Sequence, residues 1–213
     1  MGQQPWSDPG TREVVTVNAP EDASRTGTRE RIPAVALKLF AEKGYEATSM
    51  REIAEHLDMT KAALYYHFDS KEDIVRVLVA GLLEQIVELV DWARTQQRGP
   101  DLRMAVLSRW HDIMQARGLA LFRFAVADNR VFKEVGPDKL SMTRYLSDLY
   151  EILTPTDATV EDRLRIRLAL MSMNMAGIAA KTIDASDDEI LSAARKIASE
   201  LMPGDNDTDF DGR

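Results

Sequence analysis

The sequence predicts an all-α protein of about nine helices, and three observations lead to this expectation. Apolar residues recur every three or four positions through most of the region from residue 26 to residue 202. Glycine and proline are sparse, with 11 and 8 among 213 residues, and they fall mostly near the ends and between the periodic segments. No stretch shows the alternating apolar and polar pattern of a half-buried strand. The helical period therefore decides the fold class.

Two helices are expected first, and local end signals place both of them. The first runs from about residue 29 to the basic last turn before Gly44, a residue suited to a left-handed cap. Ser49 and Glu52 have the spacing of a capping box, in which each side chain accepts a hydrogen bond from the other residue's backbone N–H. They predict a short helix over 50–57.

The later helices follow from further caps. Thr60 can cap a helix over 61–67, and Ser70 with the acidic residues after it can cap a fourth helix that ends near residue 97. Five more helical segments are expected, of which 159–183 is the longest: 101–117, 119–127, 137–153, 159–183 and 186–202.

The two ends of the chain differ in composition from this helical region. Residues 1–25 contain three prolines and two glycines, and we expect a flexible N-terminal arm; residues 203–213 predict a flexible acidic tail. The first 24 and the last 11 residues each contain one basic and four acidic side chains, so they hold most of the formal net charge of -8. Residues 25–80 contain nine of each sign and are neutral.

Composition argues against several kinds of site. Without cysteine the chain has no disulfide and no thiolate metal site, which fits a reducing cytoplasm. The three histidines, His56, His67 and His111, lack a metal-ligand spacing, so neither a metal nor a cofactor is expected. No catalytic serine elbow, phosphate-binding glycine loop, signal segment or membrane span is visible, and we expect a cytoplasmic protein that is not an enzyme.

The helices expected over 50–57 and 61–67 have helix-turn-helix spacing, in which the second helix enters the major groove of DNA. Leu64 and Phe68 lie four positions apart and can join the core. The other face of that helix carries residues suited to phosphates and base edges: Lys61, Ala62, Ala63, Tyr65, Tyr66 and His67. The alternative is that both tyrosines pack between helices with their hydroxyls in water.

Residues 28–79 resemble the DNA-binding domain of TetR-type transcriptional regulators. The resemblance rests on the segments "ALKLFAEKGYEATSM", "REIAEHL", "TKAALYYHF" and "SKEDIV" and covers about a quarter of the chain. It implies a three-helix DNA-binding domain at 26–72, a helical effector-binding and dimerisation domain at 73–202, a homodimer and a palindromic operator. The family usually has Gly-Val at the turn where this chain has Asp58 and Met59, and we expect the turn to be kept.

The same resemblance implies roles for individual residues. Arg51 would read a base, with a surface ion pair to Glu55 as the alternative. Thr60 would cap the recognition helix, and Lys61, Ala62 and Ala63 would face bases. Phosphate contacts would come from Thr48, Ser49, Tyr65, Tyr66, His67 and Lys71.

Two sets of residues in the second half remain, and for each the alternative is an ordinary core. The resemblance implies a dimer interface on the last two helices: Leu164, Leu168, Met171, Met175, Ile178, Ile190, Ala194, Ile197 and Leu201. The middle helices hold methionines, aromatics and polar anchors that can line an adaptable apolar pocket: Trp92, Met104, Trp110, His111, Met114, Phe122, Tyr145 and Asn174, with Arg109, Phe124, Met142 and Tyr150 nearby.

These observations lead to one functional expectation with two alternatives. The chain is expected to be a sequence-specific DNA-binding regulator, a ligand-released repressor that binds a palindromic operator as a homodimer and takes a small apolar or amphipathic effector. One alternative is a helical small-molecule-binding protein or enzyme that keeps the helix-turn-helix as scaffold. The other is a TetR-like activator.

Overall fold

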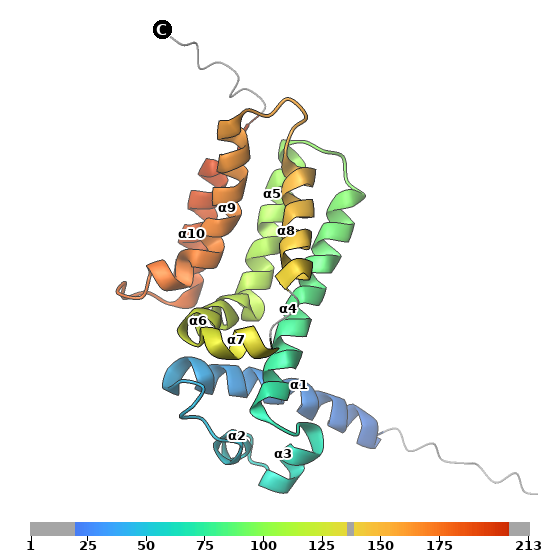
Figure 1. Cartoon of the computed structure of the whole chain (residues 1–213), viewed down its shortest axis with the longest axis vertical. Coiled ribbons are helices and arrows are strands. Elements are labelled where there is room, and N and C mark those ends of the chain that lie inside the picture. Colours follow the sequence, from blue (N-terminus) through green and yellow to red (C-terminus); the bar gives the residue numbers. More distant parts are fainter. Residues whose placement is uncertain (1–19, 136–138, 205–213) are drawn as a thin grey trace, which may run out of the picture.

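The computed structural model describes residues 20–135 and 139–204, with side chains for 27–128, 130–134 and 143–204. It confirms the all-α class (Figure 1). The described ranges contain ten α-helices and a π-helical turn, η1: α1 (Pro20–Lys43), α2 (Met50–His56), α3 (Lys61–His67), α4 (Lys71–Arg94), α5 (Pro100–Ile113), η1 (Met114–Gly118), α6 (Leu119–Ala127), α7 (Asn129–Val135), α8 (Lys139–Leu153), α9 (Val160–Ala179) and α10 (Asp187–Leu201).

All nine expected helices are present, and the structure corrects some of their limits. α1 begins at Pro20, not near residue 29, because proline is suited to a first helical turn and acidic residues follow it there. α9 ends at Ala179 and is shorter than α1 and α4, so the segment 159–183 is not the longest helix. The β-branched pair after Lys181 lowers helix propensity, and Ser186 already caps α10. α7 is an additional short helix.

Some expectations lie wholly or partly outside the described residues. The N-terminal arm is described only from residue 20, where the chain is already helical, and most of the acidic tail lies beyond residue 204. The expected start of the seventh helix at residue 137 and the side chain of Met142 are also outside the described set.

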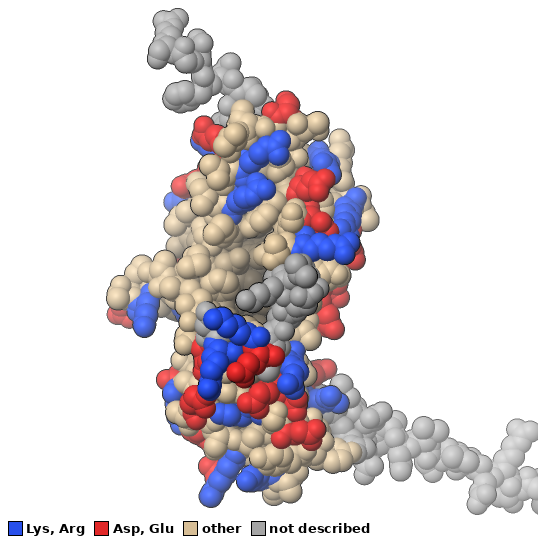
Figure 2. All heavy atoms as spheres, in the orientation of Figure 1, with Lys and Arg blue, Asp and Glu red and all other residues tan. Residues whose placement is uncertain are grey.

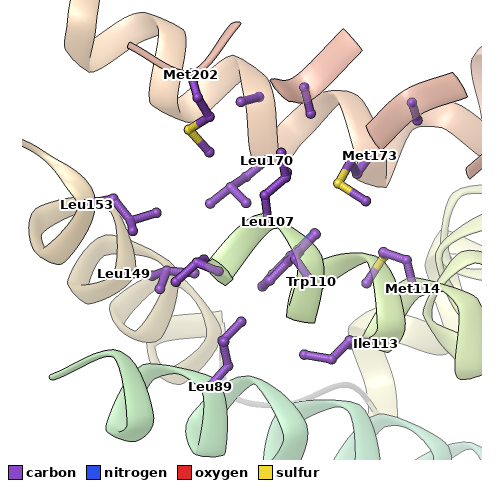
Figure 3. Close-up of a cluster of buried hydrophobic side chains, with 14 of the residues drawn as sticks. Leu89, Leu107, Trp110, Ile113, Met114, Leu149, Leu153, Leu170, Met173 and Met202 are labelled. Carbon is purple, nitrogen blue, oxygen red and sulfur yellow. The ribbon is translucent and has the colours of Figure 1, made fainter. Parts of the chain in front are cut away.

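Buried side chains form two clusters that divide the molecule into a lower and an upper body (Figure 1). The lower body consists of α1–α3, the first half of α4, most of α6, and α7, while Leu119 at the start of α6 and Met114 of η1 belong to the upper cluster. The upper body consists of the second half of α4 with α5, α8, α9 and α10, and Figure 3 shows its closely packed centre around Trp110 and Leu107. Leu82 of α4 packs against both clusters, so α4 connects the two bodies.

The core of the lower body is completed by helices from outside the first four. Leu121 and Phe124 of α6 and Val131 of α7 are almost fully buried in it. The Phe124 ring lies 5.3 Å from that of Phe40 and 5.9 Å from that of Tyr45, measured between centroids. The cluster therefore crosses residue 72, where the DNA-binding domain is expected to end.

No helix in the ranges 20–135 and 139–204 is long and apolar enough to cross a lipid bilayer.

Replacing Phe124 with alanine is expected to lower the free energy of unfolding by about 3–5 kcal/mol, because a buried ring is lost and a cavity remains. Urea denaturation measures this loss. Hydrogen exchange should rise in α1 as well as in α6, since Phe124 closes the core that holds α1. Phe122→Ala, on the same helix but only half-buried, is the control and should cost less. Faster exchange confined to α6 would contradict this account of the core.

Candidate nucleic-acid interface

α2 and α3 are short helices whose ends are fixed by local hydrogen bonds. Ser49 Oγ accepts from the backbone N–H of Glu52 at 3.2 Å, and Thr60 Oγ1 accepts from that of Ala63 at 3.1 Å, so both expected caps are confirmed. The Glu52 carboxylate also pairs with Lys43, at the end of α1. The hydrogen bond from Lys43 holds the pKa of Glu52 below its usual value.

The turn between α2 and α3 is kept, and it uses an unusual backbone conformation. Asp58 has φ of 54°, in the left-handed region that aspartate tolerates better than most residues other than glycine. The Met59 N–H donates to the carbonyl of Ala54 at 3.0 Å, which closes the end of α2. The turn expected at Asp58 and Met59 therefore forms without glycine.

α3 has one buried and one exposed face. Leu64 and Phe68 are 0% and 4% exposed and pack in the lower core, as expected. Tyr65 and Tyr66 are 42% and 69% exposed, which argues against their packing between helices. Lys61 lies beside the Tyr65 ring, with its Nζ 5.5 Å from the centroid.

The remaining positions of α3 fit the same division. Ala62 is exposed, while Ala63 and His67 are half-buried. The His67 ring meets the Tyr66 ring edge-on at 5.4 Å. α3 lies at the lower end of the molecule, and Figure 2 shows Lys and Arg side chains on the surface there. The exposed face of α3 can thus reach a groove without rearrangement of the core.

Two residues expected to contact DNA beside α2 have other partners in this structure. Thr48 is 1% exposed, and its hydroxyl donates to the Gly44 carbonyl at 2.9 Å, so its place is a structural one in the loop before α2. Arg51 is largely exposed, and its Nε donates to Glu55 at 2.7 Å. The ion pair considered as the alternative for Arg51 therefore forms, and it is an exposed, weak one.

Lys71 at the start of α4 is held inward. Its Nζ donates to the backbone carbonyl of Tyr45 at 2.6 Å and lies 4.1 Å from the centroid of that ring. The Tyr45 hydroxyl in turn donates to Glu72 at 2.6 Å. This bond is the main reason that the pKa of Glu72 lies below its ordinary value, and burial raises the pKa of Tyr45. Tyr45 was not singled out from the sequence, because only the fold brings it to α4.

The comparisons with known proteins agree with this geometry. Residues 32–78 match the model of the bacterial regulatory proteins of the tetR family. Residues 32–78 therefore form a domain of the TetR family. That family consists of regulatory proteins, which agrees with the expectation that this chain is not an enzyme.

The relatives of known name match mainly this TetR domain. The chain is 37% identical over 68 residues to the HTH-type transcriptional repressor KstR2 of Rhodococcus jostii, covering 32% of this chain and 33% of that protein. It is 36% identical over 62 residues to the negative transcriptional regulator IcaR of Staphylococcus epidermidis, covering 29% and 34%. The chain thus spans about a third of the length of these relatives.

Solved structures extend the likeness to the whole TetR fold. AmtR of Mycobacterium smegmatis superposes with a TM-score of 0.61 at 20% identity, covering 83% of this chain and 87% of that one. KstR2 of Mycobacterium tuberculosis gives 0.58 at 16% identity, covering 81% and 92%. These likenesses concern the fold.

The expected pocket residues lie in different surroundings in this structure. Trp110 and Met114 fill the upper core (Figure 3), and the Trp110 indole donates to Asn174 at 3.0 Å. Met104 is 43% exposed. Four others are half-buried: Trp92, His111, Phe122 and Tyr145. None of the eight expected residues lines the groove between α1, α6 and the end of α9.

Three residues that were expected near the pocket also have partners in the structure. The Arg109 guanidinium lies 3.8 Å from the Trp92 ring centroid, Arg167 lies 5.1 Å from the Tyr150 ring centroid, and Phe124 belongs to the lower core.

The expected dimer residues divide into three groups by exposure. Ile190 and Ala194 are buried within the protomer, and Ile178 and Leu201 are half-buried. The rest are exposed by 41–53%: Leu164, Leu168, Met171, Met175 and Ile197.

The bond between Tyr45 and Glu72 predicts a pH dependence of stability. Because folding lowers the pKa of Glu72 below its ordinary value of 4.5, the stabilisation is fully present above that value and is lost as the pH falls through the folded pKa. Thermal unfolding from pH 6 to about pH 3 should show a smaller loss of stability in Tyr45→Phe than in the wild type. Equal pH profiles would contradict the role of this bond.

Proposed function

We propose that the chain is a DNA-binding transcriptional regulator of the cytoplasm, a repressor that binds a palindromic operator as a homodimer and is released by a small effector. The observation that carries the proposal is the exposed face of α3 within a TetR domain. The names of two relatives, a transcriptional repressor and a negative regulator, favour repression over activation.

The charge distribution is consistent with this function. Residues 25–80 are neutral, so long-range attraction to DNA is weak and affinity depends on a few positioned groups. Lys61 and the two tyrosines of α3 are the first candidates, because ammonium and phenol groups bind phosphate oxygens. Arg51 can join them when its exposed pair with Glu55 opens, at a cost of tenths of a kcal/mol.

The apolar face of α9 supports the dimer. Leu164, Leu168, Met171 and Met175 are spaced by four, three and four positions and lie on one side of the helix. They are 53%, 49%, 47% and 41% exposed in the single chain. A second copy that covers this face would bury it around a two-fold axis, and the symmetry of the dimer would match that of a palindrome.

Operator binding tests the α3 face. Lys61→Ala and Tyr65→Ala should each weaken binding to DNA from upstream of the protein's own gene by about 1–3 kcal/mol, since each removes a groove or phosphate contact. Arg98→Ala, an exposed residue after the far end of α4, is the control. Footprinting and titration at physiological salt measure the effect.

Absence of any specific binding by the wild type would favour the alternative of a small-molecule-binding protein or enzyme with a helix-turn-helix scaffold. Binding that activates transcription of the neighbouring gene would favour the activator. Either outcome would contradict the proposal that the chain is a repressor.

Oligomeric state tests the α9 face. The double substitution Leu168→Glu and Met171→Glu should convert a dimer into a monomer at micromolar concentration. Both copies would place two unpaired carboxylates in the interface, and burying them is costly. Val77→Glu is the matched control, since Val77 is 42% exposed on α4. Sedimentation velocity distinguishes the two states, and a wild type that is monomeric at that concentration would contradict the proposal.

A further inference from the structure

A groove of about 940 Å³ lies where the two bodies meet, between α1, η1 with α6, and the end of α9. Figure 2 shows a notch in the left edge of the molecule below the α9–α10 connection. All three walls lie within the described residues. The volume is in the range of sites that hold small molecules.

The floor of the groove is apolar. Leu37, Phe40 and Phe124 lie at its base and are buried, whereas Val126 of α6 and Ile183 after α9 present exposed apolar surface, by 55% and 61%. Such a floor favours a ligand with an apolar body, because covering it removes apolar surface from water.

The rim of the groove is positive, in contrast to the chain as a whole. It holds four cations and only two carboxylates, in a chain with a net charge of -8. Two of the cations have partners: Arg123 donates to Asp187 at 2.7 Å, and Lys38 lies 3.9 Å from Glu42.

The other two cations of the rim are Arg117 and Lys181. Both are exposed, and neither forms an ion pair with a described carboxylate. Two unpaired cations beside an apolar floor complement a molecule that carries an anionic group at one end. The α1 helix separates this groove from α3 (Figure 1), so the rim is not part of the candidate DNA face.

We propose that this groove binds an amphipathic anion: a small molecule whose apolar body covers Val126 and Ile183 and whose carboxylate, sulfonate or phosphate group meets Arg117 and Lys181. Two of the pocket residues expected from the sequence, Trp110 and Met114, are themselves buried in the upper core.

The position of the groove gives the ligand a route to the reading helices. Phe40 and Phe124 both line it, and their contact holds α1 against α6. A ligand that binds more tightly when α1 has shifted on α6 favours the conformations with that shift, in which α2 and α3 are placed differently. By linkage, such a ligand changes the affinity for the operator. This regulatory part rests on the proposed function, whereas binding in the groove does not.

The test uses two fluorescent probes of similar apolar body. 8-Anilinonaphthalene-1-sulfonate carries a negative group, and N-phenyl-1-naphthylamine lacks it. The folded full-length protein should bind the sulfonate at least about fivefold more tightly than the neutral probe at low salt, and added salt should reduce this preference.

Variants locate the site. Arg117→Gln with Lys181→Gln should remove the preference for the sulfonate, and Ala41→Trp, at an exposed position of the groove wall, should weaken both probes by filling the space. Lys133→Gln on α7, an exposed lysine outside the groove, is the control for charge. These side chains are exposed, and circular dichroism of each variant verifies the fold.

Unchanged sulfonate binding in both groove variants, or equal binding of the two probes, would overturn the proposal. A second copy of the chain covering the groove would also overturn it, and would appear as probe binding only upon dilution to monomer. Operator titration separates the two levels: a protein that binds the sulfonate in the groove but no DNA refutes the proposed function alone. Operator affinity unaffected by saturating sulfonate refutes the regulatory part.

Discussion

The packing of α6 on α1 is the contact on which the rest of the structure depends. The lower core holds side chains from α1 to α4, but it remains open until Leu121 and Phe124 of α6 close it. Phe124 lies within 6 Å of both the Phe40 and Tyr45 rings, and Tyr45 in turn fixes the start of α4 through Glu72 and Lys71. A short path of packed side chains therefore connects α6 with the helices that would contact DNA.

α3 shows how an acidic chain can present a surface for DNA. Its seven residues are fixed at one end by the Thr60 cap and at the other by Phe68 in the core. Contacts from the exposed side to DNA would be short and oriented by the helix, so they would not require a large positive field. Lys71 is bonded to the Tyr45 carbonyl and Thr48 is buried, so neither side chain is free to reach a phosphate in this structure. The proposed contacts therefore come mainly from α3.

The same packing bears on where a small molecule could act. The centre of the upper body is filled by large apolar side chains, among them Trp110 and Leu107 (Figure 3). The groove between α1, α6 and the end of α9 lies beside the joint between the two bodies, where Gly177 lets Arg123 approach the end of α9. An effector at that joint would act directly on the contact between α1 and α6.

Sequence alone determined the helical class, the caps at Ser49, Thr60 and Ser70, and the two faces of α3, because these depend on residues three or four positions apart. It also identified the TetR domain from a local motif. Only the tertiary structure decided that α6 completes the lower core, that Lys71 turns inward to Tyr45, and that Trp110 fills the upper core. These arrangements depend on contacts between distant segments, and the apolar periodicity of a helix does not specify which neighbour it will meet.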